Sequence, residues 1–141
     1  MERLSAYSLT LLTQPSLRRL IAATGSRIVA PWATADAVAV WGRKRAAQRG
    51  MAAARRQGLP VVSFEDAPLR GLRPGVGPGW GCVRDRTGIY FDCHAPSDLE
   101  ILLNSPRPVS SEATNALALV RHYRLSKYNG WSDVTLPDAP F

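Results

Sequence analysis

The sequence predicts an α/β fold that contains a βαβ unit, a hairpin and two C-terminal helices. Two apolar runs, at 37–41 and 60–64, flank a two-faced segment at 43–57, which is the pattern of two parallel strands joined by a crossover helix. A turn motif at 85–88 and a capping box that begins at Ser97 follow this unit. These three observations place strands and helices in alternation, which defines the class.

The length and composition of the chain fit one domain, residues 1–141. A chain of 141 residues has room for a single core, and 45% hydrophobic with 21% charged residues is typical of globular proteins. No apolar run approaches the roughly 20 residues of a membrane-spanning helix. The stretch Ser8–Leu12 is too short for a secretory signal, so we expect a cytoplasmic protein.

The first half of the chain carries most of the pattern. Apolar residues at helical spacing, followed by Gly25, predict a helix over 15–24, and residues 27–30 form a candidate strand. The run at 37–41, AVAVW, does not alternate, so we expect a strand covered on both faces. The segment at 43–57 has small side chains on one arc and cations on the other. These cations are Lys44, Arg45, Arg49, Arg55 and Arg56.

The second half begins with a loop. Residues 67–81 hold five glycines and three prolines, which predicts irregular structure. We expect strands at 80–85 and 89–93, joined into a hairpin by a type I turn at Asp85–Gly88. The expected helices are 97–104 and 110–125.

Positive charge is concentrated in residues 1–60. This part holds ten Lys and Arg against Glu2 and Asp36, a net charge of +8, while the remainder holds eight against nine acids, a net charge of −1. Such an excess favours an anionic partner, for example nucleic acid, a membrane surface or a phosphorylated small molecule. A basic face that only keeps the protein soluble is the alternative.

Charged side chains follow both strands of the βαβ unit. Arg43 and Lys44 come after the first strand, and Glu65 and Asp66 come after the second. Ligands of open α/β sheets bind at the carboxyl ends of the strands. We therefore expect a site for a charged sugar or nucleotide at this edge, although a mutual surface salt bridge would explain the same residues.

Other motifs carry no chemistry. Cys82 and Cys93 are too few for a disulfide framework, and we expect reduced thiols. His94 and His122 lack partners at the spacing of a triad or a metal site, so no metal is expected. The glycine-rich stretch at 75–79 lacks the strand-to-helix context of a phosphate-binding loop.

Several stretches together resemble the capsular polysaccharide biosynthesis and export family of the KpsC/LipA type. Their order and spacing are similar to the family's over roughly residues 27–141. The matching stretches are WGRK at 41–44, GLPVVSFED at 58–66, LR at 69–70, DRTGIYFD at 85–92, PSDLEILL at 96–103 and SKYN at 126–129.

The resemblance implies a glycosyltransferase that moves 3-deoxy-manno-octulosonic acid (Kdo) from CMP-Kdo to a lipid-linked glycan acceptor. It implies a partial Rossmann-like, GT-B-like lobe, peripheral contact with the inner membrane, and no cofactor apart from the CMP-sugar donor. The residues that match the family's polar segments are Glu65, Asp66, Arg70, Lys127, Tyr128 and Asn129. With Arg43 and Lys44 they form the set of substrate-binding candidates.

The resemblance also implies that the chain is an incomplete domain, the first part of the amino-terminal lobe. The family's catalytic carboxylate is expected beyond Phe141, so the catalytic residue is unknown and the isolated chain is expected to be inactive. Ala67-Pro68 stand where the family continues with Gly and an aromatic residue, which changes the backbone freedom of that loop. The alternative function is a small basic nucleic-acid-binding module, which lacks a reader motif here.

Overall fold

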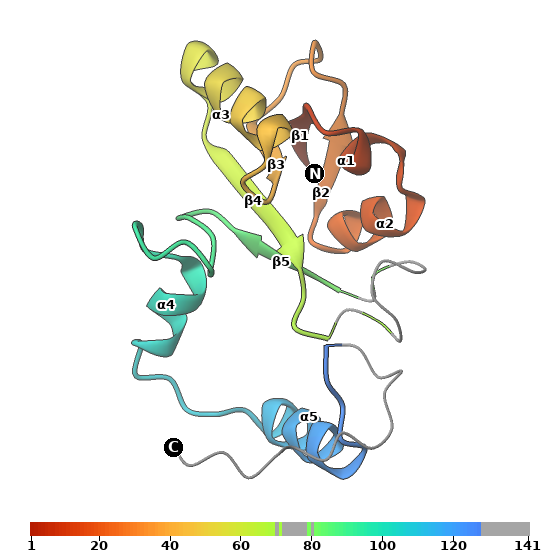
Figure 1. The fold of residues 1–141 in the computed structure, drawn as a ribbon, viewed down its shortest axis with the longest axis vertical. Helices are drawn as coiled ribbons and strands as arrows, with labels where there is room; N and C mark the ends of the chain where they lie inside the picture. The colour runs from red at the N-terminus through yellow and green to blue at the C-terminus, as the bar shows by residue number, and fades with distance from the viewer. Residues whose placement is uncertain (70, 72–78, 80, 128–141) are drawn as a thin grey trace, which may run out of the picture.

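The computed structural model describes residues 1–69, 71, 79 and 81–127 (Figure 1). In chain order the elements are β1 Glu2–Ala6, α1 Leu9–Thr13, α2 Pro15–Ala23, β2 Ser26–Val29, β3 Ala37–Trp41, α3 Arg45–Gln57, β4 Val61–Asp66, β5 Cys82–Asp85, α4 Asp98–Leu103 and α5 Ser111–His122. The α/β class is confirmed.

A sheet with the strand order β2-β1-β3-β4-β5 forms the centre of the fold. β1 runs parallel to β2 and β3, β3 runs parallel to β4, and β5 is antiparallel to β4. In the predicted βαβ unit, Val38 lies opposite Val61 and Trp41 lies opposite Phe64. The prediction of two parallel strands around the 43–57 helix is therefore confirmed.

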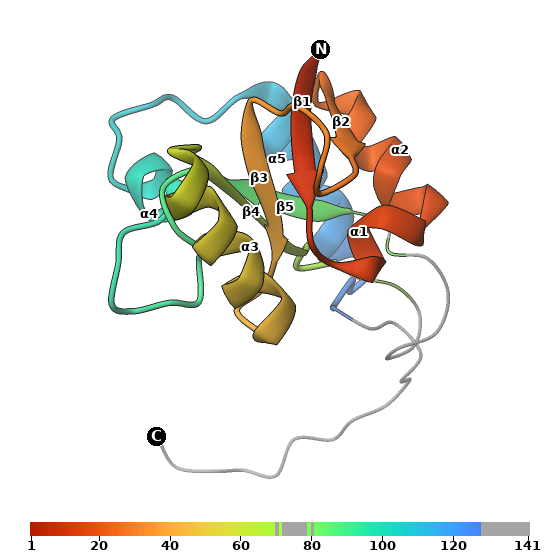
Figure 2. The same cartoon turned by 90° about the horizontal axis from the view of Figure 1, so that it is seen from above.

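Helices cover both faces of the sheet, as Figure 2 shows, with α1 and α2 on one side and α3 on the other. Ala37 and Ala39 of β3 pack in the core under α1 and α2, whereas Val38 and Val40 pack against α3. The continuous apolar run of β3 is buried on both faces, as expected from its lack of alternation.

Small residues bring α3 close to the sheet. An added Cβ at Gly50 would lie 2.8 Å from Val40 Cγ1, so only glycine permits this approach. Ala47, Ala53 and Ala54 complete the buried arc of the helix. The predicted two-faced helix is confirmed, and its cations remain on the outer surface.

The strand predicted at 89–93 is wrong, and so is the hairpin that it would form. β5 pairs with β4 instead, with Asp85 opposite Ser63. Asp85 Oδ1 accepts the amides of Thr87 at 2.9 Å and Gly88 at 2.7 Å, and Oδ2 accepts the amide of Asp98 at 3.2 Å. These bonds direct the chain toward α4, away from the edge of β5.

Gly88 fixes the same corner by close packing. A Cβ at this position would lie 2.3 Å from the carbonyl oxygen of Pro96. The side chain of Asp98 accepts the Arg86 amide at 2.7 Å and the Thr87 hydroxyl. The DRTG and PSD stretches of the family resemblance therefore form one compact structural unit.

The two late helices begin as the sequence predicts. Ser97 Oγ accepts the Glu100 amide at 3.1 Å, and Ser110 Oγ accepts the Ala113 amide at 3.2 Å, so both helices have side-chain caps. Neither α4 nor α5 buries a residue. Large apolar side chains that are exposed on them are Leu99, Ile101, Leu102, Leu103, Leu117 and Leu119.

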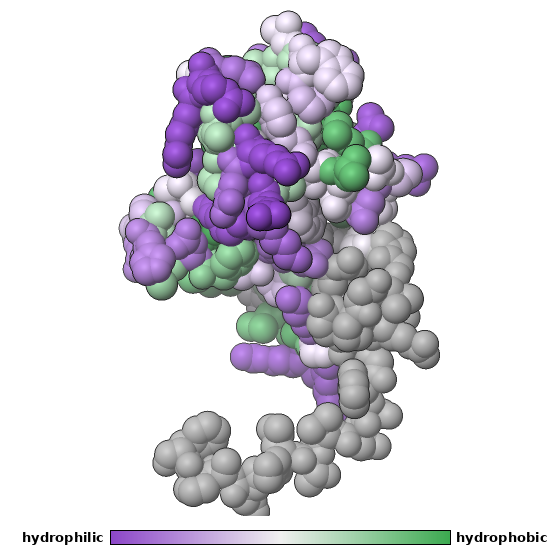
Figure 3. Space-filling model, turned by 45° about the horizontal axis from the view of Figure 1, so that its top comes forward, coloured by the Kyte–Doolittle hydropathy of each residue, from purple (hydrophilic) through white to green (hydrophobic). Residues whose placement is uncertain are grey.

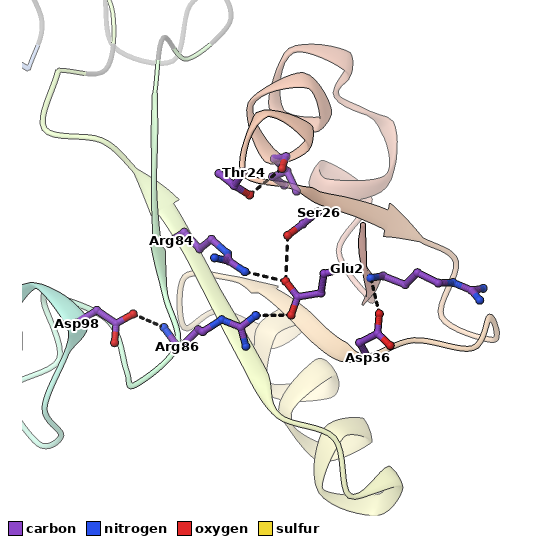
Figure 4. A network of polar contacts seen from close by, with 9 residues as sticks. Glu2, Thr24, Ser26, Asp36, Arg84, Arg86 and Asp98 are labelled. Atoms are coloured by element: carbon purple, nitrogen blue, oxygen red, sulfur yellow. Dashed lines mark hydrogen bonds and ion pairs between the residues drawn. The ribbon is translucent and has the colours of Figure 1, made fainter.

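A polar network around Glu2 joins distant parts of the chain (Figure 4). Its carboxylate accepts from the Ser26 hydroxyl at 3.0 Å, from Arg84 Nη2 at 2.7 Å, and from Arg86. Burial alone would raise the pKa of Glu2, but the hydrogen bonds from Arg86 and Ser26 and the charges of both arginines outweigh it. The pKa of Glu2 is therefore lowered, and β1, β2 and β5 are linked. β1 was not predicted from the sequence.

Candidate functional site

The carboxyl ends of β1, β3 and β4 lie at one edge of the sheet. β1 leads through α1 and α2 to β2 on one side, whereas β3 leads through α3 to β4 on the other. The strand order thus reverses between β1 and β3. Ligands of open α/β sheets bind outside the carboxyl ends at such a point, so this edge is the candidate functional site.

A small hollow of about 110 Å³ lies at this edge. Its polar side chains include Thr10, Gln14 and Asp66, and its apolar walls include Leu17 and Trp41. Its volume is below the roughly 300 Å³ of a small-molecule pocket, so it has room for one polar substituent of a ligand. Ser16, Leu20, Gly79 and Gly81 complete the lining.

Asp66 was a candidate from the sequence, whereas Thr10, Gln14 and Trp41 were not chosen. Thr10 and Gln14 were missed because β1 was not predicted, and without β1 the reversal of strand order cannot be seen. The signal that could have located them is the short Leu4/Ala6 alternation before the helical residues at 9–13.

The structure separates the two neighbouring carboxylates. β4 extends to Asp66, and successive residues of a strand point to opposite faces. Asp66 lines the hollow beside Leu17, while the Glu65 carboxylate lies over Gly42. Glu65 Oε1 also accepts the Asp66 amide at 2.9 Å. One carboxylate therefore faces the hollow, and the other supports the turn after β3.

Gly42 makes that turn possible. Its φ of 60° is in the left-handed region, and its amide donates to the Phe64 carbonyl at 2.9 Å. A Cβ at Gly42 would lie 3.0 Å from Glu65 Oε2. Both the backbone conformation and the nearby carboxylate oppose any larger residue here.

Arg43 is held by polar partners on the α3 side of the sheet. Its Nη1 donates to Ser63 Oγ at 3.1 Å, and its Nε lies 3.6 Å from Asp92 Oδ2. The salt bridge considered from the sequence paired the basic start of the helix with Glu65 and Asp66. In the structure Arg43 forms an ion pair with Asp92, a residue that was not among the candidates from the sequence.

Lys44 is exposed at the start of α3. It is the N-cap residue, its side chain makes no capping bond, and the first turn holds no acidic residue. Cations at a helix N-terminus are unfavourable unless an anion lies nearby, because the helix dipole is positive there. Lys44 is thus the candidate best placed to meet an anionic ligand at the carboxyl edge.

Three candidates, Arg70, Tyr128 and Asn129, lie outside the described residues. Lys127 is described, and its carbonyl oxygen accepts the Gly71 amide at 3.2 Å. This bond brings Lys127 beside Gly71, which follows β4 in the chain. Gly71 and Lys127 are therefore neighbours in space, although they lie 56 residues apart in the sequence.

A second and more open hollow of about 430 Å³ lies on the α3 side. It is lined by Arg43, Gln48, Met51, Phe91, Asp92, Cys93 and His94. Cys93 is exposed and Cys82 is half-buried on β5, and both are free thiols, as expected. Within the described part of the chain, no group of three His, Cys, Asp or Glu is arranged to hold a metal ion.

Comparison with known proteins decides the family. A family model described as "Capsule polysaccharide biosynthesis protein" matches residues 36–129, which include β3, α3, β4 and the DRTG and PSD stretches. The chain belongs to this capsule family. The resemblance seen in the sequence is confirmed.

Two similar curated proteins of the capsule family are "Capsule polysaccharide modification protein LipA" from Neisseria meningitidis serogroup A, serotype 4A, and from serogroup B. Each is 36% identical over 101 residues, which cover 67% of this chain and 14% of the relative. The chain thus spans about one seventh of the length of these curated relatives.

A solved structure, "Thermosulfurimonas dismutans KpsC, beta Kdo 2,4 transferase", is also similar. The match has a TM-score of 0.80 at 31% identity and covers 99% of this chain and 45% of that chain. It confirms the expected GT-B-like α/β fold. Within the described residues, no helix is long and apolar enough to pass through a bilayer.

Proposed function

We propose that this chain is part of a capsule glycosyltransferase that transfers Kdo from CMP-Kdo to a lipid-linked glycan. The carboxyl edge of its sheet would bind either the donor or the acceptor. The observation that carries the proposal is the reversal of strand order between β1 and β3, with Asp66 in the hollow and Lys44 exposed at the start of α3. The similarity to a Kdo transferase over 99% of the chain supports the substrate class.

The proposed roles follow from charge and position. Kdo carries a carboxylate and its donor carries a phosphate, and either group would be stabilised by Lys44 at the start of α3. The Asp66 carboxylate accepts hydrogen bonds, which suits a sugar hydroxyl in the hollow. Arg43 acts through Asp92 and Ser63, so we propose a positioning role for it.

We assign the transfer chemistry to residues outside the described part of the chain. Glycosyl transfer needs a nucleophile or base at a fixed distance from the anomeric carbon, and a second surface that holds the nucleotide. Glu65 and Asp66 diverge to opposite faces of the sheet, so only Asp66 lines the hollow. We therefore expect the chain alone to bind substrate weakly and to form no product.

A chimera tests the proposal. The matching segment of the Thermosulfurimonas dismutans KpsC is replaced by this chain, and product formation is measured with CMP-Kdo and a lipid-like acceptor. We expect transfer by the chimera, and a loss of about tenfold or more in the Asp66→Asn and Lys44→Gln chimeras. Arg27→Gln, exposed on the edge strand β2, is the matched control and should keep its activity.

Two results would contradict the proposal. A folded chimera that neither binds CMP-Kdo nor forms product would contradict the assignment of CMP-Kdo as the donor substrate. Product from the 141-residue chain alone would show that the transfer chemistry lies within it.

A further inference from the structure

The outer surface of α3 carries cations without acidic residues between them. Arg45, Arg49 and Arg56 lie at intervals of four and seven residues, so they share one stripe of the helix. Lys44 and Arg55 flank this stripe, and all five side chains are exposed. We call these five residues the α3 surface. Figure 3 shows hydrophilic side chains gathered over this helix.

The cations of the α3 surface make no ion pair in the described part of the chain. Arg43, Arg84 and Arg86, by contrast, each form an ion pair. Five neighbouring cations repel one another, and this cost is relieved when an extended anionic partner lies against them. The helix length of 13 residues corresponds to about 20 Å, which is more than one small anion requires.

An exposed tryptophan lies beside this surface. Trp32 is 88% exposed. The Ala33 amide donates to the Ala30 carbonyl at 3.0 Å, which closes a tight turn with Pro31 and Trp32 at its tip. The indole is therefore presented to solvent by a fixed turn.

Two hydrogen bonds tie this turn to the end of α3. Gln57 Nε2 donates to the Tyr7 hydroxyl at 3.2 Å, and that hydroxyl donates to the Pro31 carbonyl at 3.3 Å. Tyr7 also packs in the core under α3. Trp32 and the α3 surface therefore belong to one side of the molecule.

We infer that the α3 surface and Trp32 form a docking surface for an anionic lipid bilayer. Lys and Arg are attracted to anionic headgroups, and tryptophan partitions into the boundary between headgroups and acyl chains. A nucleic acid would explain the cations alone, whereas the exposed indole beside them favours the bilayer. Because α3 begins at Lys44, the membrane would lie next to the candidate site at the carboxyl edge.

Vesicle sedimentation of the 141-residue chain tests the inference, without any sugar donor, so its result is independent of the proposed function. The vesicles contain phosphatidylglycerol and phosphatidylcholine in equal parts. Each arginine near such a surface strengthens binding about fivefold, so Arg45→Gln, Arg49→Gln and Arg56→Gln together should weaken it about 100-fold. Circular dichroism verifies that the variant is folded.

The matched control removes the same charge from the opposite face. Arg18, Arg19 and Arg27 are exposed around α2 and β2 and line one hollow of about 340 Å³. Their combined change to Gln also lowers the net charge by three, and it should weaken vesicle binding by less than about tenfold at 0.15 M salt, since distant charges are screened.

Trp32 provides the second readout. Brominated lipids should quench part of the tryptophan fluorescence, and this quenching should be lost in Trp32→Phe. Equal loss of binding in the two triple variants would overturn the inference, as would equal binding to pure phosphatidylcholine. Tight binding to duplex DNA without vesicle binding at 0.15 M salt would assign the surface to nucleic acid instead.

Discussion

The buried carboxylate of Asp85 accepts the backbone amide of Asp98 at 3.2 Å, which joins the end of β5 to the start of α4. Asp85 is 1% exposed and also accepts the amides of Thr87 and Gly88. One side chain thus determines the path of the loop that the sequence suggested would be a hairpin turn.

Replacing Asp85 should be strongly destabilising. Asp85→Ala leaves three backbone donors without their acceptor, and we expect a loss of about 3 kcal/mol in the free energy of unfolding. Asp85→Asn keeps one carbonyl oxygen and should lose less. Urea unfolding measures both, with the exposed Glu100→Gln as control. A change below about 0.5 kcal/mol for Asp85→Ala would contradict the role assigned to the carboxylate.

Gly42 and Glu65 should be energetically coupled. Gly42→Ala combines left-handed strain of about 1–2 kcal/mol with the 3.0 Å approach of the Glu65 carboxylate. Gly25→Ala measures the strain alone, because its φ is 77° and no atom lies within 4 Å of an added Cβ. We expect Gly42→Ala to cost about 1 kcal/mol more than Gly25→Ala.

The extra loss of unfolding free energy at Gly42 should disappear when the Glu65 carboxylate is removed. In a Glu65→Ala background, Gly42→Ala and Gly25→Ala should lower the free energy of unfolding by similar amounts. An excess that persists in this background would assign the cost to another neighbour.

Glu2 should make stability depend on acid pH. Its pKa in the folded state lies below the ordinary value of 4.5: burial opposes this shift, but the bonds from Arg86 and Ser26 prevail. The stabilisation is therefore present above that value and is lost as the pH falls through the lower, folded pKa. Thermal unfolding from about pH 6 to pH 3 should show a smaller fall in melting temperature for Glu2→Gln than for the natural protein. Identical slopes would show that Glu2 does not contribute.

The two cysteines should differ in reactivity. Burial of the Cys82 thiol, aided by the nearby Asp66 carboxylate, raises its pKa and so lowers its thiolate fraction at neutral pH. Cys93 is exposed. At pH 8 we expect one fast and one slow reaction with a thiol reagent, and only the slow reaction in Cys93→Ser. Fast labelling of Cys93→Ser would contradict this assignment.

The elements with strong periodicity were predictable, and those decided by single side chains were not. β3 and β4 were predicted from their apolar runs. α3 was predicted from its two-faced pattern and from Gly58, which ends the helix. The strand expected at 89–93 has suitable residues, but the Asp85 carboxylate turns the chain away before a second strand can pair. Sequence patterns do not reveal which side chain accepts a hydrogen bond from a given backbone amide.

The candidate site was predictable in position and less so in composition. The carboxyl edge of the βαβ unit was expected, and Lys44 and Asp66 lie there. The separation of Glu65 from Asp66 depends on β4 continuing two residues beyond the apolar run, to Asp66. The pairing of Arg43 with Asp92 depends on a tertiary contact between segments 49 residues apart, which local pattern cannot supply.

The helices α4 and α5 are capped but bury no side chain, so we expect them to unfold separately from the sheet. Their caps fix where each helix begins, yet a 12-residue helix without buried side chains is only marginally stable in water. α5 should therefore open by local fraying, independently of the sheet, while amides of β3 and β4 become accessible only on global unfolding. Hydrogen exchange should show two classes of protection, with the boundary near Ser97, where the last bonds to Asp85 hold the start of α4.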